Sequence, residues 1–108
     1  MSIKKQLEII KNKLPNNVTL VAVSKNKSNS QILKAYHEGQ RIFGENRVQE
    51  LLKKQEELPK DIEWHLIGHL QKNKVKHIAS FISLIHSVDS IGLLKEINKR
   101  AIQYNRKI

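Results

Sequence analysis

Apolar residues recur along the chain in two alternating patterns, one with helical spacing and one made of short continuous runs. Residues 3–14 show the helical spacing, and the pattern ends at Pro15. The run that follows, Val18–Val23, is rich in β-branched residues, which is typical of a strand buried on both faces. The two patterns then repeat. Further strands are expected at Arg41–Gly44, Ile62–Ile67 and Ser83–His86, and further helices after Ser28, after Asn46, over Gln71–Ala79 and after Ser90.

Capping signals mark where three of these helices begin. Ser28 and Asn46 are each followed three residues later by a glutamine, which is the spacing of a capping box, and Ser90 can cap the last helix. The helix after Ser28 should stop at Gly39, and the helix after Asn46 should end before Pro59. The apolar face of the last helix is expected to consist of Leu94, Ile97, Ala101 and Tyr104.

Four strand–helix units after a leading helix predict the α/β class, with a parallel sheet and right-handed crossovers. The periodicity fits an open sheet and part of a (β/α) TIM-type barrel equally well. No linker or low-complexity segment divides the chain, so residues 1–108 are expected to form one unit with no internal domain boundary.

The charge is strongly basic, with 20 lysines and arginines against 10 acidic residues and a formal net charge of +10. Such a charge suits nucleic acid, an acidic membrane surface or a phosphorylated ligand. The basic residues are spread along the chain, and the densest cluster, Lys72–His77, contains no aromatic residue on which a base could stack. A basic nucleic-acid-binding module is therefore kept only as an alternative function.

The chain contains no cysteine, which excludes disulfides and thiolate metal sites and suits a reducing cytoplasm. Residues 1–14 alternate apolar and charged positions and do not resemble a signal peptide. No stretch approaches the roughly 20 apolar residues of a membrane span. We therefore expect a cytoplasmic protein that does not enter a membrane.

Polar and reactive residues follow each expected strand where it ends. In parallel α/β folds these positions meet at one edge of the sheet, where functional groups gather. The sequence therefore predicts one functional rim. The rim segments are Ser24–Lys25, Glu45–Arg47, His65–His69 and Ser87–Ser90.

Lys25 is the most informative residue of this rim. It follows six nearly unbroken apolar residues, so its stem should emerge from the sheet interior. Loss of solvation there would favour the neutral amine, which is the form that attacks an aldehyde to give a Schiff base. Alternatively, the side chain reaches solvent or pairs with a nearby carboxylate such as Glu45.

His65 and His69 are four residues apart, a spacing that places two metal ligands on one face of a helix. Here His65 falls in an expected strand, Gly68 lies between the two histidines, and no third ligand is evident. We therefore predict no metal site and interpret His65 as a strand-end histidine satisfied by hydrogen bonds. Asn46 and Ser87 have small polar side chains whose ordinary roles are helix capping and turn formation.

The strand-end motifs occur together in a recognisable order and spacing. They are Leu20–Lys25, Phe43–Glu50, Trp64–Lys74 and His86–Ser90. In these motifs the chain resembles the pyridoxal phosphate homeostasis family, and the resemblance covers essentially its whole length.

This resemblance implies a fold-type III pyridoxal phosphate barrel, similar to the barrel domain of alanine racemase. It implies that pyridoxal 5′-phosphate is the cofactor, held as a Schiff base on Lys25, and that Asn46, His65 and Ser87 line the rim around it. Members of the family are regarded as cofactor carriers in vitamin B6 homeostasis, so no catalysis is expected. A lysine-dependent enzyme of racemase or aldolase type stays a third hypothesis, for which the sequence shows no second acid or base.

The family barrel is about twice as long as this chain, and a complete (β/α)₈ barrel needs at least about 200 residues. The resemblance therefore implies that residues 1–108 correspond to the N-terminal half of the barrel, about four βα units after a leading helix. In the family the phosphate-binding loops lie in the other half, so we expect this chain to bind the cofactor weakly. Four units would also leave two open sheet edges, and a homo-oligomer is expected if this chain is the native unit.

Overall fold

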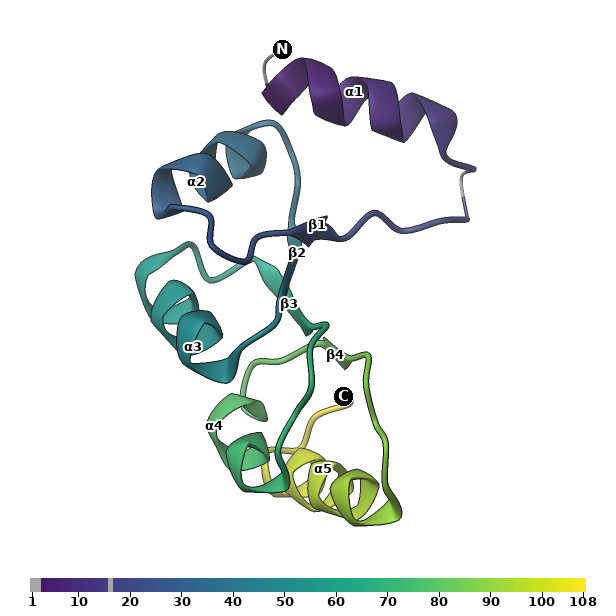
Figure 1. Ribbon diagram of the computed structural model, residues 1–108, viewed down its shortest axis with the longest axis vertical. Helices are drawn as coiled ribbons and strands as arrows, with labels where there is room; N and C mark the ends of the chain where they lie inside the picture. Colours follow the sequence, from purple (N-terminus) through teal and green to yellow (C-terminus); the bar gives the residue numbers. More distant parts are fainter. Residues whose placement is uncertain (1–2, 16) are drawn as a thin grey trace.

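Four short parallel strands form the centre of the structure, a computed structural model that describes residues 3–15 and 17–108. The strands pair in sequence order, β1 with β2, β2 with β3 and β3 with β4 (Figure 1). The elements are α1 (Ile3–Lys13), β1 (Ala22–Val23), α2 (Asn29–His37), β2 (Ile42–Glu45), α3 (Val48–Glu57), β3 (Glu63–Leu66), the 3₁₀ turn η1 (Lys72–Lys74), α4 (Val75–Ile78), β4 (Leu84–Ile85) and α5 (Ile91–Gln103).

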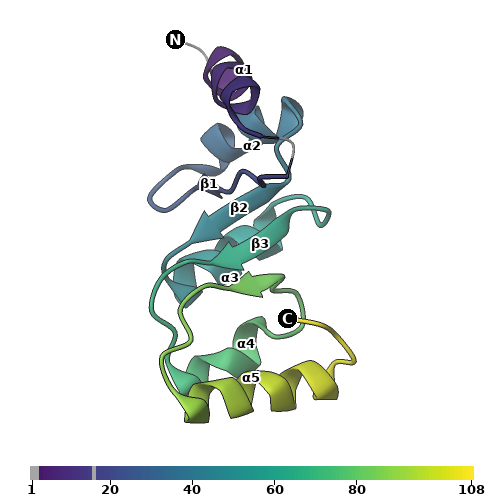
Figure 2. The same cartoon turned by 90° about the vertical axis from the view of Figure 1, so that its right-hand side faces the viewer.

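The helices α2, α3 and α4 cover one face of the sheet, and the other face is open (Figures 1 and 2). α1 lies beyond β1 and contacts α2, while α5 packs against α4 and η1. Trp64 and Leu66 of β3 are 2% and 0% exposed and belong to the core between the sheet and the helices. Because side chains alternate along a strand, Glu63 and His65 lie on the open face.

The order of elements confirms the α/β class and the parallel sheet predicted from the sequence, and it is the arrangement expected of consecutive βα units of a TIM-type barrel. The prediction for the first strand was wrong in two respects. Pairing covers only Ala22–Val23, and Val18 and Val23 are 47% and 53% exposed, so the run is not buried on both faces. The reason is that β1 has only β2 beside it among the described residues, and its second face belongs to the open side of the sheet.

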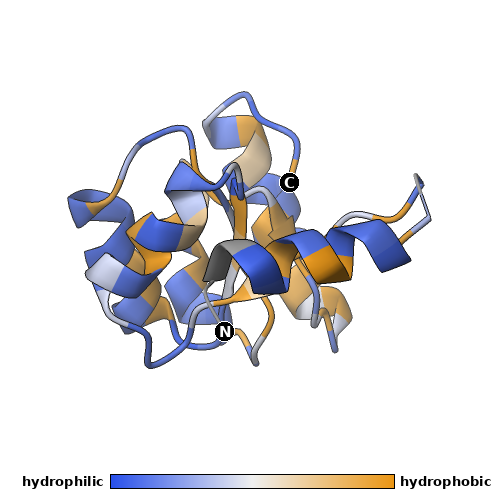
Figure 3. Cartoon of the chain, turned by 90° about the horizontal axis from the view of Figure 1, so that it is seen from above, coloured by the Kyte–Doolittle hydropathy of each residue, from blue (hydrophilic) through white to orange (hydrophobic). Residues whose placement is uncertain are grey.

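The leading helix is only loosely covered. Leu7 packs against the core, whereas Ile9 and Ile10 are 41% and 43% exposed. Figure 3, in which α1 lies in front, shows hydrophobic and hydrophilic residues alternating along this helix. A hollow of about 430 Å³ remains beside it, lined by Leu7, Ile10 and residues of β1 and α2.

Two of the three predicted helix caps are confirmed. The Gln31 N–H donates to Ser28 Oγ at 3.2 Å, and the Ser28 N–H donates to the Gln31 side chain at 3.0 Å. Ser90 Oγ accepts the N–H of Leu93 at 3.1 Å. The cap at Asn46 was wrong, because β2 extends to Glu45 and α3 begins at Val48, so that Arg47 occupies the capping position without a side-chain bond.

The buried face of α5 also differs from its prediction. Ile97 and Ala101 are buried as expected, but the third residue of the stripe is Leu93, which is 3% exposed. Leu94 and Tyr104 are 55% and 42% exposed. A face that begins at Leu93 and a face that begins at Leu94 both reach Ile97 by helical steps, of four and three residues respectively. The spacing alone therefore could not tell which leucine is buried.

The core is one cluster that extends from Ile32 in α2 to Ile97 in α5. No helix in residues 3–15 and 17–108 has the length and apolar character needed to cross a membrane. The absence of an internal domain boundary stays a prediction.

Candidate functional site

The register of the sheet brings the carboxyl ends of its four strands to one edge. Because all four strands run in the same direction, the segments that follow them leave the sheet at this edge, as predicted for the rim. One row of paired residues just before the edge consists of Val23, Gly44, His65 and Leu84.

Lys25 lies in a tight turn immediately after β1. The turn is closed by the N–H of Lys27, which donates to the carbonyl of Ser24 at 3.1 Å. The Lys25 side chain is exposed, so the loss of solvation expected from the sequence is not observed. The predicted alternative partner, Glu45, is bound to another lysine, Lys54.

A hollow of about 160 Å³ lies beside this turn. It is lined by Lys25 and Asn46, two of the four site residues predicted from the sequence, together with Asn26, Arg47 and Glu50. The amine of Lys25 and the amide of Asn46 can therefore face the same small molecule.

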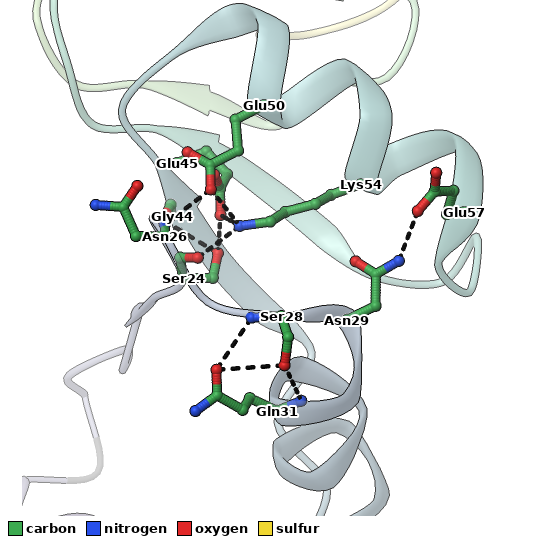
Figure 4. A network of polar contacts seen from close by, with 10 residues as sticks. All are labelled: Ser24, Asn26, Ser28, Asn29, Gln31, Gly44, Glu45, Glu50, Lys54 and Glu57. Atoms are coloured by element: carbon green, nitrogen blue, oxygen red, sulfur yellow. Dashed lines mark hydrogen bonds and ion pairs between the residues drawn. The ribbon is translucent and has the colours of Figure 1, made fainter.

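Beneath the turn lies a buried polar network that joins β1, β2 and α3 (Figure 4). Ser24 and Glu45 are 2% and 0% exposed, and Ser24 Oγ donates to Glu45 Oε2. The Lys54 ammonium donates to Glu45 Oε2 at 2.9 Å, to Glu50 Oε2 at 2.9 Å and to the Ser24 carbonyl at 2.6 Å. Two carboxylates thus share one buried cation.

Glu50 also receives the N–H of Asn26, at 2.8 Å. The hydrogen bond from Lys54, assisted by this backbone N–H and by the charges of Lys54 and Arg47, holds the pKa of the Glu50 carboxyl below its usual value. Partial burial acts in the opposite direction and is outweighed. Glu50 therefore acts as a charged acceptor for the turn residue Asn26 near neutral pH.

Neither Lys54 nor Glu50 was identified as a site residue from the sequence. Lys54 occupies the apolar stripe of α3, three residues after the buried Leu51 and four before the buried Leu58. A lysine on such a stripe needs a charged partner, and Glu50 lies one helical turn before it. The four-residue spacing of Glu50 and Lys54 was the feature of the sequence that could have identified this ion pair.

A second cluster of polar side chains lies on the open face of the sheet around His65. Its Nδ1 is 3.1 Å from Nε2 of His86, and its Nε2 is 3.3 Å from Oε2 of Glu63. One ring nitrogen of the histidine pair must carry the hydrogen and the other must accept it. The prediction of a hydrogen-bonded strand-end histidine is confirmed. Nothing in the sequence identified His86 as its partner, and the predicted site residue Ser87 is exposed.

His69 does not join His65. Its Nδ1 lies 3.5 Å from Oδ2 of Asp89, and both side chains are largely exposed. Within residues 3–15 and 17–108, no three histidine, aspartate or glutamate side chains gather as a metal site would require.

The chain is similar in sequence to known proteins. Residues 1–108 match the family model of the alanine racemase N-terminal domain. Pyridoxal phosphate homeostasis proteins from Aquifex aeolicus, Schizosaccharomyces pombe and human are 47%, 49% and 45% identical over 91, 80 and 86 residues. The matches cover 83%, 74% and 73% of this chain but only 40%, 33% and 31% of those proteins, so the chain spans less than half their length.

The solved structure of PipY from Synechococcus elongatus with PLP bound superposes with a TM-score of 0.90 and 45% identity. The match covers 96% of this chain and 50% of PipY. PipY without PLP gives the same TM-score and 44% identity. These matches confirm the resemblance predicted from the four strand-end motifs.

Proposed function

Because the chain belongs to the alanine racemase N-terminal domain family, we propose that it binds pyridoxal phosphate and holds the cofactor as a Schiff base on Lys25. The observation that carries this proposal is the position of the Lys25 side chain. It is exposed, it lines a hollow at the edge where parallel α/β folds bind ligands, and its amine has no hydrogen bond or ion pair among the described residues. The solved structure of PipY with PLP bound supports pyridoxal phosphate as the ligand.

The neighbouring side chains fit such a cofactor. An accessible primary amine can form a C=N bond with an aldehyde carbon, with release of one water. Asn46, in the same hollow, can donate an amide hydrogen to an oxygen substituent. The pair His65–His86 lies farther along the open face. No phosphate anchor is assigned to these residues, which is why binding to this chain is expected to be weak.

We assign the protein a carrier role in pyridoxal phosphate homeostasis, in line with the names of its relatives. The observation that favours an enzyme of racemase type is the pair His65–His86, which could move a proton on the rim. An assay for racemised or cleaved amino acids with added cofactor separates the two functions. We expect no turnover above that of free cofactor, and turnover abolished by His65→Gln would establish the enzyme instead.

Reductive labelling tests the attachment site. The chain is incubated with pyridoxal phosphate, reduced with borohydride and mapped by peptide mass spectrometry. We expect the label on Lys25, because it is the one lysine among the described residues that lines the hollow shared with Asn46. Lys25→Arg should remove that label, whereas the matched variant Lys27→Arg, in the same turn, should keep it. Label spread over exposed lysines with none enriched at Lys25 would overturn the proposal.

A further inference from the structure

Lys54 reaches from α3 to the turn that carries Lys25. Its side chain is 7% exposed, and its ammonium donates to three oxygens, which is the full capacity of a lysine. Because every donor is used inside the network, Lys54 itself has no hydrogen free for a cofactor. The three acceptors are the carbonyl of Ser24, Oε2 of Glu45 and Oε2 of Glu50 (Figure 4).

These contacts fix the peptide groups on both sides of Lys25. The Ser24 carbonyl, on one side, accepts from Lys54, and the Ser24 N–H donates to the Gly44 carbonyl at 3.0 Å. The Asn26 N–H, on the other side, donates to Glu50. Asn26 has a φ of 60°, in the left-handed region, which asparagine tolerates better than most residues with a side chain. The contact with Glu50 adds to this local preference.

The network is poorly suited to stabilising the fold for its own sake. Removing the Lys54 ammonium and the Glu45 carboxylate from water costs several kcal/mol per ion, and apolar side chains of the same volume often stabilise as well or better. Glu45 Oε1 is buried and has no hydrogen-bond partner within the described residues, so the network is not fully satisfied. What it does achieve is a fixed connection between α3 and the turn after β1.

We propose that Lys54, together with Glu45 and Glu50, is a positioning group for Lys25. By holding Ser24 and Asn26, it directs the amine between them toward the hollow shared with Asn46. Lys54 does not contact the cofactor. This inference rests on the proposed function, since it concerns the presentation of the lysine that attaches the cofactor.

The experiment compares label at Lys25 with label at Lys72, an exposed lysine on η1 that serves as an internal reference. The variants are Lys54→Met, Glu50→Met and the matched control Lys53→Met, which removes the same charge as Lys54→Met from an exposed position of the same helix. Lys54→Met and Glu50→Met should lower the Lys25/Lys72 ratio by about tenfold or more, because small misplacements of a reacting group reduce its rate strongly. Lys53→Met should leave the ratio unchanged.

Lys54→Met also leaves Glu45 as an unpaired buried charge and could unfold the chain. The double variant Lys54→Met/Glu45→Gln removes that charge but does not restore the donor to Ser24. It should therefore fold, as judged by circular dichroism, and still show the low ratio. Glu50→Met keeps the Glu45–Lys54 pair, removes the acceptor of the Asn26 N–H and so tests the Asn26 side of the turn alone.

A second readout needs no cofactor. Hydrogen exchange at the Asn26 amide should accelerate in the Lys54 and Glu50 variants, and should be unchanged in Lys53→Met. A folded double variant with the wild-type labelling ratio would overturn the positioning role while leaving the proposed function intact. An unlabelled Lys25 in the unchanged chain would overturn the proposed function, and the positioning role with it.

Discussion

At the scale of single residues, Gly68 shows how closely the rim segments approach each other. A Cβ at this position would lie 2.9 Å from Cα of Asn46 and nearer still to the Asn46 carbonyl oxygen. The obstacle is main chain and not the tip of a flexible side chain, so the segment after β3 or the segment after β2 would have to move. Glycine is required here for close approach, and this approach sets the position of Asn46.

We expect Gly68→Ala to destabilise the fold by about 1–3 kcal/mol, as overpacking usually does. Gly92 in α5 is the matched control, since a Cβ there meets nothing within 4 Å. Gly92→Ala should raise stability by about 0.5–1 kcal/mol, because alanine loses less backbone entropy in a helix. Denaturant unfolding measures both variants. Equal stability of Gly68→Ala and the unchanged chain would show that the segment after β3 adjusts freely.

Two lysines show what the sequence could and could not predict about the site. Lys25 was found because only Ser24 separates it from the apolar run Val18–Val23, and local order is enough to identify a strand end. Its assumed burial was wrong, because burial depends on what covers the second face of β1. The possible pairing of Glu45 with Lys25 was wrong for a similar reason. Glu45 points toward the helices, where it forms an ion pair with Lys54 of α3. Such pairings depend on the packing of elements that are distant in the sequence.

At the scale of elements, the orientation of α5 decides which of two adjacent leucines stabilises the fold. Leu93 is 3% exposed and Leu94 is 55% exposed. Leu93→Ala should destabilise the protein by about 2–5 kcal/mol, because it leaves a cavity in the core. Leu94→Ala should change stability by less than about 0.5 kcal/mol. Urea unfolding of the two variants measures the difference, and a larger loss for Leu94→Ala would mean that α5 is rotated relative to this structure.

The elements themselves were largely predictable. Order, type and parallel pairing follow from the alternation of patterns, and the caps at Ser28 and Ser90 were correct because a capping side chain bonds within three residues. Asn46 failed as a cap, although its spacing to Gln49 was equally good, because β2 continues to Glu45 and moves the start of α3. Where a residue could end a strand or begin a helix, tertiary packing determines which of the two elements it joins.

At the scale of the whole molecule, the sheet has one covered face and one open face, and β1 and β4 each have a single neighbouring strand among the described residues (Figure 2). The open face of the sheet carries exposed apolar side chains, including Val23 of β1, which is 53% exposed, and Leu84 of β4, which is 45% exposed. Unpaired strand edges and apolar patches favour association with another chain. The open surface adjoins the rim at the carboxyl ends of the strands.

We expect the 108-residue chain to form a homodimer or larger assembly through this surface, because closed two-fold dimers are the commonest way to bury such edges. Val23→Lys and Leu84→Lys place charges on the surface and should shift the chain toward monomer. Ile102→Lys, at a position 71% exposed on α5, is the matched control and should leave the assembly unchanged. Light scattering over a range of concentrations measures the mass, with circular dichroism to confirm folding. A folded 12.5 kDa monomer at high concentration would contradict the prediction, since the edges would then be tolerated in water without a partner.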